Sequence, residues 1–128
     1  MKNLIVDATR DKIFLTLIVS KNIYTCSHEN SKINFEKLMI LINDFLMVNS
    51  SSLDQIDAIY VNRGPGSFAG IRNSLSTIKA LFLTRKIDYY CYSFSDFKDS
   101  VATQYVDVPM LCKKYKIKKN LINPIYLS

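Results

Sequence analysis

The residues best placed to do chemistry lie in one loop, from Arg63 to Arg72, which holds all three glycines of the chain. Glycine adopts positive φ and lets another backbone or a ligand approach closely. The loop joins a strand-like run to a helix-like run, and backbone N–H groups at a helix N-terminus attract anions. Two interpretations stay open, a phosphate-binding loop and a tight turn that starts a helix. The loop residues singled out are Gly64, Pro65, Gly66, Ser67, Phe68 and Gly70.

A carboxylate and a hydroxyl come close together where the first apolar run ends, at Asp7 and Thr9. In nucleotide-handling folds such a pair can serve a metal ion and a phosphate. An isolated aspartate after a strand also forms turns by bonding to its own backbone. The pair is therefore a candidate for a vestigial nucleotide site or for a turn.

Other catalytic arrangements find no match in the residues. The glycine loop lacks the Gly-Lys-Ser/Thr of a Walker loop, and Ser67 has Pro65 and Ala69 where a nucleophile elbow requires glycines. The single histidine, His28, has no indicated partner for activating a nucleophile. No His or Cys pair has metal-ligand spacing. We therefore expect no catalytic residue, no bound metal and no cofactor.

Length and composition indicate one globular domain. The chain has 128 residues, of which 48% are hydrophobic and 22% charged. It contains no apolar run long enough to cross a bilayer and no recognisable signal peptide, so we expect a cytoplasmic location without membrane attachment. Its three cysteines are widely spaced, which favours reduced thiols over a disulfide framework.

Positive charge is concentrated near the C-terminus. The net charge is +6, and the residues from Val108 onward contain five lysines and no acidic residue. Such a run could attract RNA phosphates through a salt-dependent interaction, and it could equally be a solvated segment. Contact with tRNA is thus one hypothesis for these lysines, which are Lys113, Lys114, Lys116, Lys118 and Lys119.

Hydrophobic periodicity predicts an α/β fold in the order β-β-β-α-β-α-β-α, with the first three strands as an antiparallel meander. Ser31 or Asn34 is the expected cap of the first helix, and the pattern fades after Pro109. The expected strands are 3–8, 13–19, 23–26, 56–61 and 88–92, and the expected helices are 34–48, 71–85 and 95–103.

The first two helices offer more than a core-facing stripe. Apolar residues cover about half of the circumference of helix 34–48, whereas packing on one sheet needs about 100°. Helix 71–85 carries small or uncharged residues on a second side, which would let a neighbouring helix approach closely. The surplus apolar surface suits either a thick core or a partner protein.

The loop resembles the signature of the TsaB (YeaZ) family, which reads Gly-Arg-Gly-Pro-Gly-Ser-Phe-Thr-Gly-Leu-Arg. The opening run from Leu4 to Thr9 is similar to that family's first strand, which ends in Asp-Thr-Ala or Asp-Thr-Ser. His28 before a helix also fits the family pattern. The resemblance covers residues 3–97.

The resemblance implies an actin-like, ribonuclease-H-like lobe that is not itself a catalyst. In that family the protein pairs with the catalytic subunit TsaD, the ATPase TsaE joins them, and the complex makes threonylcarbamoyladenosine in tRNA. The two helices form the pairing surface, and a homodimer is expected when the chain is alone. The implied interface residues are Phe35, Leu38, Met39, Ile42, Phe45, Leu46, Ile71, Arg72, Leu75, Ser76 and Ala80.

The chain also departs from the family pattern. Ala69 stands where the family has Thr, Asn73-Ser74 replaces Ile-Gly, and Ala80 replaces a common Gly. Family members usually carry a second lobe, for which this length has no room. The ending 124–128 nevertheless resembles the family's C-terminal Pro-x-Tyr-Leu-Arg. We expect a single lobe over 1–107 and a basic tail, 108–128, that returns to it.

A single lobe provides half of an actin-like cleft, which cannot bury a nucleotide. The sequence therefore favours a non-catalytic subunit of the threonylcarbamoyladenosine-forming complex. Two alternatives remain, a minimal phosphotransferase that uses Asp7 and the glycine loop, and a tRNA-binding module with a basic tail.

Overall fold

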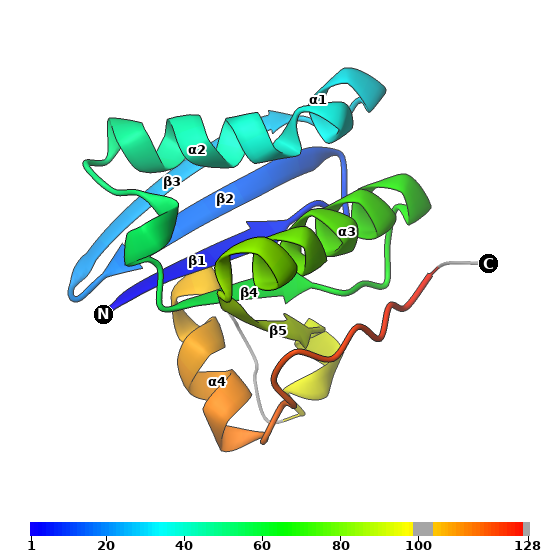
Figure 1. The fold of residues 1–128 in the computed structure, drawn as a ribbon. Coiled ribbons are helices and arrows are strands. Elements are labelled where there is room, and N and C mark those ends of the chain that lie inside the picture. The colour runs from blue at the N-terminus through cyan, green and yellow to red at the C-terminus, as the bar shows by residue number, and fades with distance from the viewer. Residues whose placement is uncertain (99–103, 127–128) are drawn as a thin grey trace.

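A computed structural model describes residues 1–98 and 104–126. It confirms the predicted fold class, an α/β lobe built on one mixed five-stranded sheet in the order β3-β2-β1-β4-β5 (Figure 1). The first three strands form the expected antiparallel meander, and β4 and β5 are parallel to β1. The strands are β1 (Lys2–Asp7), β2 (Lys12–Val19), β3 (Asn22–Glu29), β4 (Ala58–Asn62) and β5 (Asp88–Tyr92).

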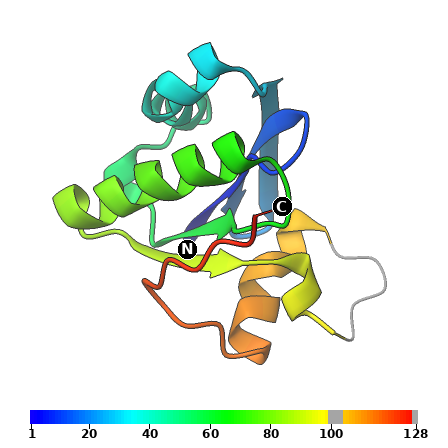
Figure 2. The same cartoon turned by 90° about the vertical axis from the view of Figure 1, so that its right-hand side faces the viewer.

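Helices cover both faces of the sheet (Figure 2). The helices α1 (Lys32–Glu36), α2 (Leu38–Val48) and α3 (Phe68–Arg85) lie on one face, which we call the α2/α3 face. The helix α4 (Val108–Lys114) lies on the other, the α4 face, with the 3₁₀ turns η2 (Phe94–Asp96) and η3 (Tyr105–Asp107). A further 3₁₀ turn, η1 (Leu53–Gln55), precedes β4.

Alternation along the strands gives each face its own core. Leu4 and Val6 of β1 face α2 and α3, whereas Ile5 between them faces α4. The α2/α3 core is almost wholly aliphatic, with Phe45 and Tyr89 as its buried aromatic residues. The buried members of the α4 core are Ile5, Ala58, Tyr60, Tyr92, Phe97, Val108, Leu111 and Cys112.

The expected helix 34–48 is wrong as one unbroken helix. It divides into α1 and α2 at Lys37, whose φ of −112° and ψ of 24° are not helical. Ser31 is the N-cap of α1, because the Ser31 hydroxyl accepts a hydrogen bond from the Asn34 N–H at 3.3 Å.

The C-terminal part of the prediction is also corrected. The expected helix 95–103 overlaps the 3₁₀ turn Phe94–Asp96 at its start, residues 97 and 98 are not helical, and 99–103 lie outside the described residues. The last helix is instead α4, where the fading pattern predicted no regular structure; Pro109 fits its first turn. In the described ranges no helix combines the length and hydropathy needed to cross a membrane.

Candidate functional site

A buried carboxylate organises the carboxyl ends of β1 and β4. Asp7 Oδ1 accepts hydrogen bonds from the Thr9 N–H at 3.0 Å and the Thr9 hydroxyl at 2.7 Å. Asp7 Oδ2 accepts from Asn62 Nδ2 at 3.0 Å and from the Tyr105 hydroxyl at 2.7 Å. Asp7 is only 1% exposed. These four donors occupy the carboxylate, so its geometry is that of a turn-former and structural anchor.

Tyr105 donates to this carboxylate although it lies 98 positions away in the sequence. Burial, the charge of Asp7 and the hydrogen bond to it raise the pKa of Tyr105 well above its usual value. The phenol therefore stays protonated and donates to Asp7 at neutral pH. The bond connects the turn at η3, on the α4 face, to the end of β1.

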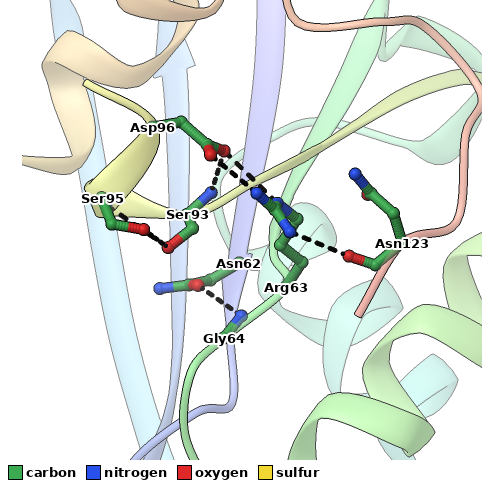
Figure 3. Close-up of polar contacts among 7 residues, drawn as sticks. All are labelled: Asn62, Arg63, Gly64, Ser93, Ser95, Asp96 and Asn123. Atoms are coloured by element: carbon green, nitrogen blue, oxygen red, sulfur yellow. Dashed lines mark hydrogen bonds and ion pairs between the residues drawn. The ribbon is translucent and has the colours of Figure 1, made fainter. Parts of the chain in front are cut away.

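Arg63 holds a second polar cluster at the same edge (Figure 3). Its guanidinium bonds to both oxygens of Asp96, at 2.6 Å and 3.3 Å, and donates to the Asn123 carbonyl at 3.1 Å. Asp96 also accepts from the Ser93 N–H at 2.8 Å. One arginine thus ties the loop after β4 to η2 and to the C-terminal segment.

The glycine loop is packed tightly against the turn after β1. A Cβ on Gly70 would collide with the Ala8 carbonyl, and one on Gly66 would collide with the Thr9 carbonyl. Gly64 has a φ of +112° and lies against the Ile125 carbonyl. Each glycine is therefore required for close approach of two backbones.

Several N–H groups of the loop are satisfied inside the chain. The Ser67 N–H donates to the Thr9 carbonyl at 2.8 Å, and the Ser67 hydroxyl accepts from the Gly70 N–H at 3.2 Å. The Gly64 N–H donates to Asn62 Oδ1 at 2.9 Å. Ser67 thereby caps α3, and the geometry favours the helix-starting turn over the phosphate-binding loop. A hollow of about 300 Å³ remains beside it, lined in part by Arg10 and Ser95.

The predicted interface divides between core and surface. Phe35 and Met39 are half-buried, and Arg72, Ser76 and Ala80 are exposed. Most of the others pack in the core and cannot present a surface to a partner, so for those residues the prediction is wrong. The residues corrected in this way are Leu38, Ile42, Phe45, Leu46 and Ile71. Leu75 is also buried, but it lines the groove beside α3.

The exposed side of α3 forms one wall of an apolar groove of about 560 Å³. Ser76, Ala80 and Leu83 line it from the helix, and Ile122 and Tyr126 line it from the C-terminal segment. Sequence reasoning missed the contribution of that segment, because only the folded chain brings it beside α3. The exposed Ile40 and Met47 of α2 lie on the same side of the sheet.

The histidine has a neighbour that the sequence did not indicate. His28 lies in β3, and its Nε2 is 3.7 Å from Cys26 Sγ. Burial raises the pKa of Cys26, which keeps the thiol protonated and poorly nucleophilic. Among the residues described, no cluster of three or more His, Cys, Asp or Glu could hold a metal ion.

The five lysines do not form a single extended tail. Lys113 and Lys114 end α4, and Lys116 and Lys118 follow in the exposed segment beyond it. Lys119 lies beside β5 through a bridge to Tyr90, with its Nζ 3.7 Å from Asp88 Oδ2. All five side chains are exposed.

The segment that contains the glycine loop and α3 matches a known protein family. A model of the family described as TsaD, tRNA N6-adenosine threonylcarbamoyltransferase, matches residues 28–93, slightly more than half of the chain. The chain belongs to this family. The match includes α2, the glycine loop, α3 and β5.

Its relatives confirm the predicted resemblance to TsaB (YeaZ) proteins. The chain is 26% identical over 119 residues to the "tRNA threonylcarbamoyladenosine biosynthesis protein TsaB" of Buchnera aphidicola subsp. Schizaphis graminum, covering 93% of this chain and 52% of the relative. It is 34% identical over 65 residues to the protein of the same name from Buchnera aphidicola subsp. Baizongia pistaciae, covering 44% and 29%. The chain therefore spans at most about half of the length of these relatives.

Solved structures share the fold. YeaZ from Pseudomonas aeruginosa superposes with a TM-score of 0.66 and 21% identity, over 72% of this chain and 43% of that one. RuvC from Thermus thermophilus superposes with a TM-score of 0.55 and 10% identity, over 90% and 80%. The lobe therefore has the same fold as these two proteins, in agreement with the predicted ribonuclease-H-like, actin-like fold class.

Proposed function

We propose that this chain is a non-catalytic subunit of a complex that forms threonylcarbamoyladenosine in tRNA, where it binds a TsaD-like catalytic subunit. The observation that carries the proposal is the apolar groove between α3 and the C-terminal segment, which offers a surface for another protein. The names of the matching relative and family refer to threonylcarbamoyladenosine biosynthesis. A TsaE-like ATPase would join through the complex. Alone, the chain would form a homodimer through the same surface.

The shape of the α3 surface supports binding of another protein. Ser76 and Ala80 are small, exposed and one turn apart, so a helix from a partner can approach closely there. Leu83, also exposed, extends the apolar wall by about one more turn. With Ile40 and Met47 exposed on α2, the two neighbouring helices offer apolar contacts along their outer sides.

The proposed absence of catalysis is supported by the saturated polar groups. Asp7 is buried and accepts four hydrogen bonds, so it has no free oxygen for a metal or a proton transfer. The Arg63 guanidinium is bound to Asp96 and Asn123. These groups hold the glycine loop and α3 in place. We propose that they position the pairing surface and do not take part in a reaction.

The test is association with the TsaD of the same organism, followed by threonylcarbamoyl transfer to tRNA. Ala80→Arg places a long charged side chain in the groove and should weaken the complex by at least about 100-fold, because it removes close packing and buries a charge. The matched control is Ser52→Arg, at an exposed loop position before η1. Transfer activity of the reconstituted mixture should fall with Ala80→Arg and stay unchanged with Ser52→Arg.

Size-exclusion chromatography with light scattering distinguishes the outcomes. If Ala80→Arg is folded by circular dichroism but still co-elutes with the TsaD-like subunit, the α3 groove is not the pairing surface. If the unmodified chain neither binds that subunit nor supports transfer, the proposed function is wrong.

A further inference from the structure

A second cavity lies on the opposite face of the sheet, between α4 and the strands, with a volume of about 490 Å³. It falls within the size range of small-molecule sites. We call it the tyrosine–lysine pocket, and its polar lining consists of Asn3, Tyr60, Tyr90, Cys112, Lys113 and Lys116.

The two tyrosines provide neighbouring hydrogen-bond donors. Tyr60 and Tyr90 are register partners on β4 and β5, and their rings are stacked with centroids 5.0 Å apart and an interplanar angle of 10°. Their hydroxyls therefore extend in the same direction from the sheet. Burial, with Tyr90 and Cys112 nearby, raises the pKa of Tyr60 to about 12, which keeps this hydroxyl protonated at neutral pH.

Two ammonium groups belong to the same pocket. Lys113 ends α4 and Lys116 lies in the turn that follows, and both line the cavity. In the described part of the chain neither lysine has an ion-pair partner, whereas Lys119 lies close to Asp88. Two tyrosine hydroxyls and two lysines make a set of donors suited to an anion such as phosphate.

Asn3 contributes a hydrogen-bond acceptor to the pocket, whereas the tyrosines and lysines contribute donors. Its side chain is only 8% exposed, and its Oδ1 is buried with no hydrogen-bond partner in the ranges that the structure describes. Buried acceptors are normally satisfied, so this oxygen requires a hydrogen-bond donor, which the fully ionised phosphate group of a monoester does not have. A complementary ligand would carry both an anionic group and an N–H donor.

We propose that the tyrosine–lysine pocket binds a nucleoside monophosphate that has an exocyclic amine. The lysines and tyrosine hydroxyls contact the phosphate, and Asn3 Oδ1 accepts a hydrogen bond from the amine of the base. The helices α3 and α4 lie on opposite faces of the sheet (Figure 2). The pocket is lined from α4 and the groove from α3, so the inference does not depend on the proposed pairing with a TsaD-like subunit.

The direct test is calorimetric titration of the whole chain with AMP, adenosine and purine riboside monophosphate, which lacks the amine. AMP should bind saturably, adenosine about 10-fold more weakly or worse, and the riboside monophosphate about 5-fold more weakly. Replacing both Lys113→Gln and Lys116→Gln should weaken AMP about 10-fold, whereas Lys32→Gln, exposed on α1, should change nothing.

Asn3→Leu separates binding from folding. It should lower AMP affinity to that of the riboside monophosphate and leave the latter unchanged, while the melting temperature stays the same or rises because an unsatisfied acceptor is removed. Should Asn3→Leu fail to fold, Tyr90→Phe replaces it and should weaken AMP about 5-fold. Absence of saturable AMP binding at about 1 mM, or equal loss with Lys32→Gln, would overturn the site.

The nucleotide could be free or at the end of an RNA strand, and competition distinguishes the two. If a 5′-phosphorylated oligoadenylate displaces AMP and the 5′-hydroxyl oligomer does not, the ligand is a terminal nucleotide of RNA. If neither displaces AMP, the pocket takes the free nucleotide. Either result supports ligand binding in the tyrosine–lysine pocket.

Discussion

The two faces of the sheet are built differently. On the α2/α3 face, helices of 11 and 18 residues seal a core that is almost wholly aliphatic. On the α4 face, a helix of seven residues and two 3₁₀ turns cover a core rich in Tyr and Phe, beside cavities of about 380 and 490 Å³. The 560 Å³ groove beside α3 lies outside the α2/α3 core, because the long helices exclude water from the sheet beneath them. The short helix and turns leave polar groups and space next to the sheet itself.

The two faces of this small lobe therefore contribute differently: the α2/α3 face mainly stabilises the fold, and the α4 face provides space for a ligand. The α2/α3 face supplies most of the dry apolar burial that offsets conformational entropy. The α4 face keeps buried hydroxyls and an amide next to open volume, which is where small ligands bind. Substitutions matched between the faces can therefore test the comparison.

The largest effect is expected from Leu38→Asp on the α2/α3 face. Leu38 is 1% exposed, and a carboxylate there would lie unpaired in the core. The loss should exceed about 4 kcal/mol, enough to unfold a domain of ordinary stability. Circular dichroism during urea denaturation measures it.

The control for this substitution is Ile40→Asp on the same helix. Ile40 is 57% exposed on the outer side of α2, so the change should stay within about 0.5 kcal/mol. Equal destabilisation by both substitutions would mean that the outer side of α2 is also covered in solution.

An intermediate effect is expected from Tyr105→Phe on the α4 face. The substitution removes the 2.7 Å hydrogen bond to Asp7 and leaves the other three donors in place. We expect a loss of about 1–2 kcal/mol in the free energy of unfolding, since a charged acceptor loses one partner.

The same variant has a pH signature. The folded-state pKa of Tyr105 is raised above its usual 10.0, so the unfolded chain loses this proton first as pH rises. The stabilisation is complete below about pH 10 and is lost as pH climbs toward the folded pKa. Urea denaturation from pH 8 to 11 should show a shallower alkaline decline for Tyr105→Phe; an unchanged decline would contradict this assignment.

Local patterns in the sequence predicted much of the fold. The strands follow from apolar runs, and the start of α3 follows from Ser67 and the glycines, because these signals involve neighbouring residues. The break at Lys37 and the helix α4 were missed, since neither has a strong local signal.

The sites depend on contacts between distant residues and were harder to predict. Tyr105 reaches Asp7 across 98 positions, and Tyr60 meets Tyr90 only because β4 and β5 pair in register. Periodicity also shows which residues share a side of α2 without showing how much of that side the sheet covers. For this reason Leu38 and Ile42 were assigned to a surface although both are buried in the core.

The smallest effect is expected where the α4 face is uncovered. Ile23 of β3 is 48% exposed and lines the 380 Å³ cavity with Arg10 and Tyr105. Ile23→Thr keeps a β-branched side chain, so strand propensity is preserved and little apolar burial is lost. The free energy of unfolding should change by less than about 0.5 kcal/mol.

The same substitution on the α2/α3 face gives the contrast. Ile13 of β2 is fully buried there, and Ile13→Thr should cost about 2–4 kcal/mol because it removes packed methylene volume and buries a hydroxyl. Urea denaturation of both variants measures the difference between a sealed and an open face on adjacent strands. A cost above about 1 kcal/mol for Ile23→Thr would mean that this part of the α4 face is covered in solution, and the contrast between the faces would then be limited to the pocket beside α4.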